Sequence, residues 1–329
     1  MHGGAALSGE HEIIDLRGQV PEDMAGQRLD AVLARMYPDY SRSRIQQWIQ
    51  AGWVRVDGET PRPRDAARAG ARVVIRARTE AASRDLPEPI PLDVVYEDDT
   101  LLVINKPPGL VVHPAAGNRA GTLVNALLHH APDLAVLPRA GIVHRLDKET
   151  SGLLVVARTL EAHTDLVRQL QARAVGREYL ALVQGAVVAG GTVEAPIGRH
   201  PVDRKRMAVV TGGKPAVTHY RVQARFAAHT LLRVNLETGR THQIRVHMAH
   251  IHHPIVGDPV YGGRLKLPAG LSETAREALK ALRRQALHAA RLELVHPKTG
   301  ETMAWEAPMP EDISRLLGSL EGGRMKDEG

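Results

Sequence analysis

A proline-rich segment divides this chain of 329 residues into a short part and a long part. Residues 79–92 contain Pro87, Pro89 and Pro91 among small and polar side chains, a composition typical of a semi-rigid linker. Because a chain of this length exceeds what one hydrophobic core usually organises, two domains are the default expectation. The sequence therefore predicts a flexible arm, a small domain, a linker, a large domain and a tail, at residues 1–18, 19–80, 81–92, 93–312 and 313–329.

The composition excludes several classes of protein. The chain is 43% hydrophobic and 24% charged, as expected for a globular protein with a substantial core. It contains no cysteine, which excludes disulfide frameworks, cysteine-ligated metals and thiol nucleophiles. No apolar run approaches the roughly 20 residues that cross a bilayer, and the N-terminus lacks the pattern of a secretory signal. We therefore expect a cytoplasmic protein without a membrane partner.

The small domain combines two short helices with two strands. Apolar side chains recur at helical or strand spacing, which predicts helices at 28–36 and 42–50 and strands at 54–56 and 73–75. Ser41 is the predicted N-cap of the second helix, and Gly52 is its predicted C-cap. Asp57-Gly58, directly after the first strand, is the strongest short signal for a tight turn.

The large domain mixes strands and helices without a fixed repeat. Its predicted strands are 101–104, 142–143, 153–157, 179–183, 217–224 and 231–236, and its predicted helices are 122–130, 160–172 and one opened by Thr241. Several strands follow one another through short turns, with helices inserted between some of them. This order predicts an α+β fold with a mixed, largely antiparallel sheet rather than a regular β-α-β array.

Positive charge is concentrated in one segment of the large domain. The whole chain carries 43 Lys and Arg against 37 Asp and Glu, a formal charge of +6. Residues 200–245 hold nine Lys and Arg against Asp203 and Glu237. Such a surplus suits a polyanion such as nucleic acid, but a solvated strand face has the same composition. Charge alone leaves both interpretations open.

A polar loop between two apolar runs is the strongest candidate for a site. Residues 141–157 read Gly-Ile-Val-His-Arg-Leu-Asp-Lys-Glu-Thr-Ser-Gly-Leu-Leu-Val-Val-Ala, which places ionisable groups at the end of rigid strands. Taken by itself, Asp147 is more readily explained as a turn residue, because Asp near Thr-Ser-Gly is common turn chemistry. A protein-kinase loop is excluded, since Leu146 interrupts His-Arg-Asp and the other kinase motifs are missing.

The segment from His144, His-Arg-Leu-Asp-Lys-Glu-Thr-Ser-Gly-Leu-Leu-Val-Val-Ala, closely resembles the catalytic motif of the RluA family of pseudouridine synthases. Three further segments agree with that family in order: Val-Ile-Asn-Lys-Pro-Pro-Gly-Leu-Val-Val-His-Pro at 103–114, Arg-Glu-Tyr at 177–179, and Leu-Glu-Thr-Gly-Arg-Thr-His-Gln-Ile-Arg-Val-His-Met at 236–248. The small domain resembles the αL, or S4-type, RNA-binding motif. The resemblance covers residues 20–310 and implies an RNA-binding domain followed by a pseudouridine-synthase domain.

The resemblance implies isomerisation of uridine in RNA. Neither a phosphate-binding Walker motif nor a dinucleotide-binding G-x-G-x-x-G is present, so no cofactor is expected. No metal is expected at the four histidines 247, 250, 252 and 253 either, because family members carry His-Met-Ala-His here without one. Residues 218–220 and 248–263 look most like members that modify large-subunit ribosomal RNA. The implied substrate is 23S RNA or a pre-50S particle, at uridines of the helix 69 hairpin loop, with the protein as a monomer.

Three residues match the family's catalytic positions. Asp147 would be the essential carboxylate, which must be ionised to add to the ribose or the base or to stabilise an oxocarbenium charge. Arg245 would be the cation beside it, although a structural salt bridge is the alternative. Tyr179 would stack on the target base and reach the sugar with its hydroxyl, although the strand pattern alone favours a packing residue.

Six further residues are candidates for RNA contact, and two nearby arginines, Arg62 and Arg64, are possible additions. Guanidinium groups suit phosphate because their planar forks bind it bidentately. The candidates are Arg42, Arg44 and Arg55 in the small domain, with Arg62 and Arg64 nearby, and Arg145, Arg240 and His242 in the large domain. Each Arg taken alone is more often an exposed solvating residue. A catalytically inactive RNA-binding factor for ribosome assembly therefore remains the alternative to an enzyme, and an intact set of Asp147, Tyr179 and Arg245 favours the enzyme.

Overall fold

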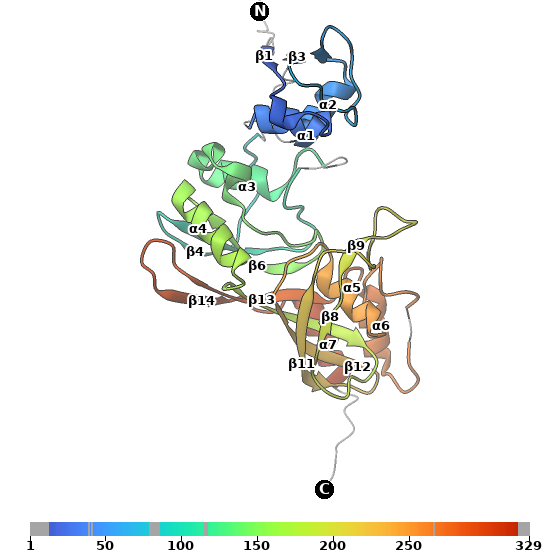
Figure 1. Ribbon diagram of the computed structural model, residues 1–329. Coiled ribbons are helices and arrows are strands. Elements are labelled where there is room, and N and C mark those ends of the chain that lie inside the picture. The colour runs from blue at the N-terminus through green and yellow to red at the C-terminus, as the bar shows by residue number, and fades with distance from the viewer. Residues whose placement is uncertain are drawn as a thin grey trace, which may run out of the picture. The chain divides into compact units, whose positions relative to one another are not determined.

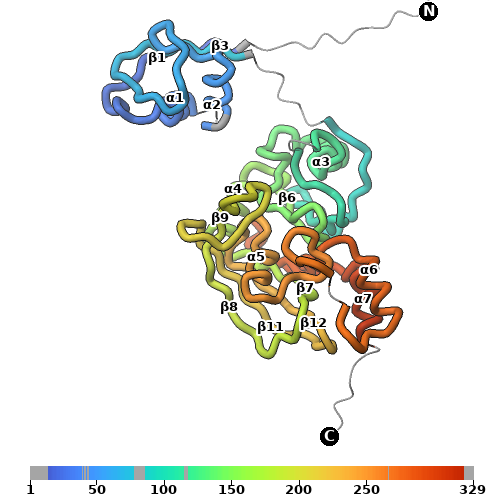
Figure 2. Tube along the Cα trace, turned by 90° about the vertical axis from the view of Figure 1, so that its right-hand side faces the viewer, coloured from blue at the N-terminus to red at the C-terminus, as the bar shows by residue number. Residues whose placement is uncertain are grey.

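The computed structural model describes residues 13–38, 40, 42–78, 86–114, 118–265 and 267–321. The chain forms two compact units, residues 1–84 and 85–329 (Figure 2). Ser41, the predicted N-cap, lies outside the described residues, as do residues 1–12 of the predicted arm and 322–329 of the predicted tail. No helix among the described residues is long and apolar enough to cross a membrane.

The first unit packs two helices against a three-stranded antiparallel sheet (Figure 1). Its elements are β1 (Ile13–Gln19), α1 (Leu29–Met36), α2 (Arg42–Gln50), β2 (Val54–Val56) and β3 (Arg72–Arg78), in the sheet order β1-β3-β2, with a 3-10 turn at Glu22–Met24. Both predicted helices and both predicted strands are therefore confirmed. The core includes Val32, Leu33, Ile45, Trp48 and Ile75, all at most 2% exposed.

Two details of the first unit bear on the predictions. The flexible arm predicted for residues 1–18 is wrong from Ile13 onward, because β1 pairs with β3 along its whole length. Ile14 and Leu16 contact the core while Asp15 and Arg17 point outward, so this strand is half polar. The tight turn at Asp57-Gly58 is confirmed, with both residues at positive φ.

The second unit is built on one large mixed sheet. Its strands run in the order β4-β5-β6-β13-β7-β12-β11-β8, and β14 also pairs with β13. Strands β6 and β13 are parallel, and the other neighbouring strands of this sheet are antiparallel. The predicted fold class is confirmed. The strands are β4 (Val94–Glu97), β5 (Leu101–Lys106), β6 (Ser151–Ala157), β7 (Gly176–Gln184), β8 (Gly191–Glu194), β11 (Val217–Arg225), β12 (His229–Leu236), β13 (Leu287–Val295) and β14 (Thr302–Glu306), and a separate hairpin pairs β9 (Ile197–Arg199) with β10 (Met207–Val209).

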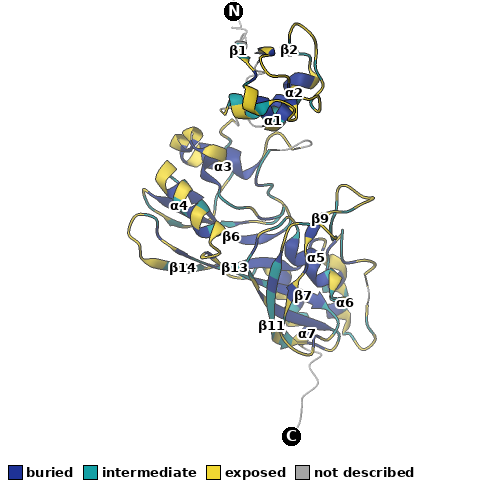
Figure 3. Ribbon diagram, in the orientation of Figure 1, coloured by how far each residue is buried: buried dark blue, intermediate teal, exposed yellow. Residues whose placement is uncertain are grey.

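The most apolar strands are covered on both faces. Alternate residues of β5 and β6 belong to two different cores, and both strands are largely buried (Figure 3). Helix α3 (Leu123–His130), capped by Thr122 as predicted, shares one core, and α4 (Leu160–Gln171) shares the other. Burial on both faces explains why these strands have continuous apolar sequences instead of alternating ones.

Three further helices contribute to the core of the other half of the sheet. They are α5 (Gln243–His250), α6 (Glu273–Ala281) and α7 (Glu311–Glu321). Residues 313–321 are therefore not a tail, and that prediction is wrong: Ile313, Leu316 and Leu320 are at most 4% exposed. Their helical spacing of three and four residues places all three side chains on one face.

Residues 142–143, which precede the polar loop, do not form the strand that was predicted there. They follow a 3-10 turn at Pro132–Val136 and a tight turn at Pro138–Gly141, in which Arg139 and Ala140 have positive φ, and only Ile142 makes a bridge, to Val156. Gly141 has φ +78°, and a Cβ there would lie 2.0 Å from the carbonyl oxygen of Ala157. The chain therefore passes β6 at close range, and the polar loop that follows leads into the start of β6 at Ser151 without adding a strand.

Candidate active site

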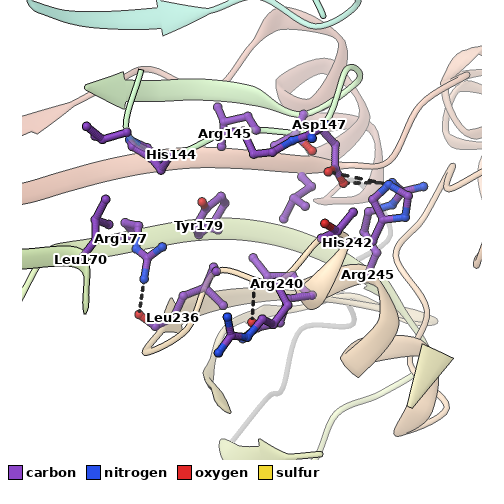
Figure 4. A pocket seen from close by; sticks show the side chains of 18 of the residues that line it. His144, Arg145, Asp147, Leu170, Arg177, Tyr179, Leu236, Arg240, His242 and Arg245 are labelled. Carbon is purple, nitrogen blue, oxygen red and sulfur yellow. Dashed lines mark hydrogen bonds and ion pairs between the residues drawn. The ribbon is translucent and has the colours of Figure 1, made fainter. Parts of the chain in front are cut away.

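The predicted catalytic residues line one cavity of about 540 Å³ in the second unit (Figure 4). The loop before β6 contributes Asp147, strand β7 contributes Tyr179, and helix α5 contributes Arg245. Arg145, Arg240 and His242 line the same cavity. The volume lies within the range of ordinary ligand pockets. Segments about 100 residues apart in the sequence thus meet around one space.

Asp147 is held by Arg245, which a second carboxylate holds in turn. The Nη1 atom of Arg245 donates a hydrogen bond to Oδ2 of Asp147 at 3.0 Å. Its Nε and Nη2 atoms donate to the two oxygens of Asp258 at 2.7 and 2.9 Å. Backbone N–H groups of Val260 and Tyr261 also donate to Asp258. Asp258 therefore fixes the direction of Arg245, which presents one N–H group to Asp147.

Charge pairing outweighs burial at both Arg245 and Asp258. Burial alone lowers the pKa of Arg245, but its hydrogen bond and charge interaction with Asp258, and then those with Asp147, raise the pKa above its ordinary value. Burial alone raises the pKa of Asp258, but the Arg245 guanidinium and two backbone N–H groups hold it below its ordinary value. Both side chains are therefore charged at neutral pH.

The start of α5 is built differently from the prediction. His242, with φ +56°, is the N-cap residue and makes no side-chain cap bond, so the assignment of Thr241 as the cap is wrong. The side chain of Gln243 instead ties the start of the helix to its surroundings: its Oε1 accepts bonds from the Thr238 hydroxyl and the Arg240 N–H, and its Nε2 donates to strand β11. This anchor places Arg245 less than one turn inside the helix, facing Asp147.

The hydroxyl of Tyr261 determines how His242 faces Asp147. That hydroxyl accepts the N–H of Met207 at 2.9 Å and lies 2.8 Å from Nδ1 of His242. Nε2 faces the Asp147 carboxylate, whose negative charge favours a proton on that nitrogen. We therefore assign the imidazole proton to Nε2, and the Tyr261 hydroxyl donates to Nδ1. Nε2 lies 3.9 Å from Oδ1 of Asp147. Burial, more than any nearby charge, lowers the pKa of His242, so the ring is neutral at pH 7.

Tyr179 is a buried side chain that still lines the cavity. Its residue is 6% exposed, and burial raises the pKa of its hydroxyl. It belongs to the same apolar core as Leu146 and Ile244, which flank the cavity. The packing interpretation and the active-site interpretation are therefore both compatible with its position.

Two side chains fix the loop that carries Asp147. Nε2 of His144 accepts the N–H of Val155 at 3.1 Å, and burial lowers the pKa of this histidine to about 3. The ammonium of Lys106, a fully buried residue, donates to the carbonyl oxygens of Pro107, Leu110 and Lys148 at 2.8 to 3.1 Å. These bonds join the loop to two neighbouring segments, so that the backbone beside Asp147 is held from both sides.

The candidate RNA-binding residues have diverse surroundings. Arg145 is exposed at the cavity, and Nε of Arg240 donates to the carbonyl oxygen of Pro215. In the first unit, Arg42 pairs with buried Asp30 at 2.9 Å, and Arg55 bonds to Thr60. Arg44 lies on the same helix as Arg42. Arg62 and Arg64 are exposed in the segment between β2 and β3.

Two of the four histidines in and after α5, His247 and His253, bond to other parts of the fold. Nδ1 and Nε2 of His247 lie 2.8 and 2.9 Å from the Thr218 hydroxyl and the Ala195 carbonyl oxygen, and Nδ1 of His253 lies 2.9 Å from the carbonyl oxygen of Gln184. Within the part of the chain that the structure describes, no three His, Asp or Glu side chains are grouped so that they could hold a metal ion.

Sequence reasoning assigned no role to three residues that the structure brings to the site. Asp258 and Tyr261 belong to a segment that was noted only for its resemblance, and Arg177 belongs to the Arg-Glu-Tyr motif, of which only Tyr179 received a role. The one available signal was their position within those matching segments. Their contacts with Arg245, His242 and the cavity arise only from the tertiary fold.

Comparisons with known proteins agree with this geometry. Residues 100–250 match the RNA pseudouridylate synthase family, and residues 27–73 match the S4 domain. The chain is 58% identical over 313 residues to ribosomal large subunit pseudouridine synthase D of Pseudomonas aeruginosa, covering 95% of this chain and 98% of the relative. It is 59% identical over 301 residues to the protein of that name from Xanthomonas campestris, covering 92% and 91%.

Two solved structures of RNA pseudouridylate synthase domain proteins are also similar to this chain, at lower sequence identity. Human RNA pseudouridylate synthase domain containing 4 superposes with a TM-score of 0.55 at 27% identity, covering 69% of this chain and 92% of that one. A second human protein, RNA pseudouridylate synthase domain containing 1, has a TM-score of 0.51 at 24% identity, covering 74% and 98%, and supports the fold. The predicted resemblance is confirmed: the chain belongs to the RluA family of RNA pseudouridine synthases.

Proposed function

We propose that this protein converts uridine to pseudouridine at specific sites of large-subunit ribosomal RNA, with Asp147 as the essential carboxylate. One observation carries the proposal. Asp147 is the acidic residue among the described residues that line the cavity, and its Oδ1 accepts no hydrogen bond from them while Arg245 holds Oδ2. The relatives named ribosomal large subunit pseudouridine synthase D support the choice of RNA.

The reaction moves a bond without changing the composition of the RNA. The bond from N1 of uracil to C1′ of ribose breaks, the base turns, C5 bonds to C1′, and the proton of C5 is replaced by one on N1. The free oxygen of Asp147 adds to the sugar or the base, or stabilises positive charge on the sugar while the base is detached. Tyr179 holds the base and is the candidate to accept a proton.

A uridine inside a helix has to leave the stack to reach Asp147. Flipping costs a few kcal/mol and costs least for a base that is already unpaired, which favours a hairpin loop. Among such loops, the family resemblance implies the helix 69 loop of 23S RNA, and we propose it as the substrate, free or in a pre-50S particle in the cytoplasm. Contacts to the RNA come from Arg145, Arg240 and His242 at the cavity and from Arg42, Arg44 and Arg55 in the S4 unit.

The proposal is tested on transcripts of large-subunit hairpins, deproteinised 23S RNA and pre-50S particles. The purified chain is incubated with each RNA in EDTA without any added cofactor, and pseudouridine is mapped by carbodiimide modification and reverse transcription. We expect stops at uridines of the helix 69 loop, and none when those uridines are replaced by cytidine. Binding without conversion on every substrate would overturn the proposal and support an inactive assembly factor. Light scattering tests the monomer, expected at 35.8 kDa.

A further inference from the structure

Arg177 is a buried cation without a counter-ion. The residue is 8% exposed, and its Nε atom has no hydrogen-bond partner. Its Nη2 atom reaches the carbonyl oxygen of Leu236 at 3.5 Å, the limit of a hydrogen bond. The neighbouring carboxylate in β7, Glu178, pairs with Arg233 instead. No described carboxylate lies within ion-pair distance of this guanidinium, an arrangement that is costly unless an anion binds there.

The guanidinium of Arg177 faces the cavity of the active site. Arg177 is one of the lining residues, and a Cβ on Gly239 would lie 2.8 Å from its Nη1 atom. Because Gly239 has no side chain, the guanidinium of Arg177 can occupy the space next to it. Arg177 and Tyr179 are two positions apart in β7, so both side chains leave the same face of the strand, about 7 Å apart. Figure 4 shows Tyr179 between Arg177 and the pair formed by Asp147 and Arg245.

The charges around the cavity leave Arg177 free for a ligand. Of the described lining residues, Asp147 is the one carboxylate, and the arginines are 139, 145, 177, 240 and 245. Arg245 already binds two carboxylates, Asp147 and Asp258. Arg145 is exposed, whereas Arg177 is desolvated, and a charge-assisted bond gains most in such surroundings.

We propose that Arg177 binds one phosphodiester group of the substrate RNA, adjacent to the nucleotide held between Asp147 and Tyr179. The inference rests on the proposed function in one respect, that the substrate is RNA. A phosphodiester carries a full negative charge and matches the guanidinium fork, whereas neutral uracil would leave the buried charge uncompensated before reaction. Arg177 thus anchors the backbone while Tyr179 receives the base.

The test combines a variant of the protein with a neutral phosphate in the RNA. Synthetic helix 69 hairpins each carry one uncharged methylphosphonate at a phosphate on either side of a loop uridine. Their binding is measured in the Asp147→Asn background, where no product accumulates, with and without Arg177→Gln. We expect one methylphosphonate to weaken binding about tenfold with Arg177 present, as hydrogen bonds to charged groups are strong, and to have no further effect with Arg177→Gln.

Two other readouts separate an anion site from other roles. The slope of log affinity against log salt should fall by about 1 in Arg177→Gln and stay unchanged in Arg315→Gln, a control on an arginine whose side chain is 71% exposed. The thermal midpoint of Arg177→Met should not fall, because an unpaired buried charge is removed.

Two results would overturn the proposal. A midpoint several degrees lower in Arg177→Met would indicate a structural role. Contact with the base would be indicated by two results together: the methylphosphonate weakens binding equally with and without Arg177→Gln, and Arg177→Gln lowers kcat in the chain that keeps Asp147. Because binding is measured independently of turnover, a wild-type chain that fails to convert uridine would count against the proposed function and leave the test of Arg177 valid.

Discussion

Each of the two units of this protein pairs an aspartate with arginine, but the two carboxylates differ in exposure and in how many hydrogen bonds they accept. In the S4 unit, the side chain of Asp30 is 0% exposed and accepts bonds from Arg28, Arg42 and Gln46. In the catalytic unit, the side chain of Asp147 is 17% exposed and accepts one hydrogen bond from the described residues, from Arg245. Every lone pair that is already bonded is unavailable to a substrate, so Asp30 is suited to hold helices together and Asp147 is suited to chemistry.

A third carboxylate extends the comparison within the catalytic unit. Asp258 lies next to Asp147 through Arg245, yet both of its oxygens are occupied by Arg245 and by backbone N–H groups. Its position near the cavity therefore does not make it a reacting group. The number of bonds already accepted separates the three roles better than burial or the identity of the partner does.

The largest expected effect separates Asp147 from Asp30. Asp147→Asn removes the charged oxygen that faces the cavity, so turnover should fall by roughly 1,000-fold or more, as for other essential catalytic groups. RNA affinity should stay within a few fold because the basic residues are unchanged. The unfolding free energy should change by about 1 kcal/mol or less, since one hydrogen bond is affected. Single-turnover kinetics, RNA binding and denaturant unfolding check the three parts, and parallel loss of affinity and activity would contradict the assignment.

The next expected effect concerns Asp258. Asp258→Asn leaves the buried guanidinium of Arg245 without its charged bidentate partner. The free energy of unfolding of the protein should therefore fall by about 3 kcal/mol. Arg245 would then turn toward Asp147 or water, and kcat should fall about 10- to 100-fold while RNA affinity is kept. Denaturant unfolding and single-turnover rates measure both effects. A variant with normal stability and normal kcat would show that Asp258 does not position Arg245.

The sequence predicted the apolar framework well because burial imposes visible patterns. Strands β5 and β6 are continuous apolar runs, and Thr122 stands at a recognisable helix start. Strand β1 was missed although its apolar and charged residues alternate as in a half-buried strand, because the alternation is short and its partner β3 lies more than 50 residues away. Helix α7 was missed because the resemblance ended just before it, although its apolar spacing was present.

The site shows a similar limit. Asp147 and Arg245 are 98 residues apart, and their pairing was expected from matching motifs rather than from local pattern. Asp258 and Tyr261 carry no local signal for their contacts with Arg245 and His242, since these contacts depend on how the loop after α5 folds back. The opposite holds for Arg42, which was interpreted as an RNA contact although the structure also gives it an ion pair with Asp30.

A smaller effect is expected on the stability of the S4 unit. The hydrogen bond from Arg28 lowers the pKa of Asp30 most, and burial raises it. The bonds from Gln46 and Arg42 lower it further, so the pKa of Asp30 lies well below its ordinary value. Because the folded pKa is depressed, this stabilisation is complete above about pH 5 and is lost as pH falls through the unfolded value near 4 and then the folded value. Asp30→Asn should therefore lower stability by about 2 kcal/mol at pH 7 and flatten its acid dependence.

Hydrogen exchange at residues 42–50 against pH checks this prediction for the S4 unit alone. The matched control is Asp15→Asn, because Asp15 pairs with exposed arginines and its side chain is 40% exposed. The control should lose little stability, because ion pairs between exposed side chains contribute little. Equal losses in both variants would show that the saturated carboxylate is no more important than a surface one.

The smallest expected effect tests the free oxygen of Asp147 through His242. With the proton on Nε2, the neutral ring presents an N–H group toward Oδ1, and Gln can place an amide N–H near the same point while Asn cannot. His242→Gln should therefore retain kcat/KM within about threefold. His242→Asn should lose about tenfold, the effect of one charge-assisted hydrogen bond that forms only when the 3.9 Å separation closes in the substrate complex. Burial opposes protonation of His242, so loss of activity caused by its protonation should begin below pH 6.5 and be absent in His242→Gln. Profiles of kcat/KM from pH 5 to 8 measure both effects, and equal losses in the two variants would show that the Nε2 proton has no role.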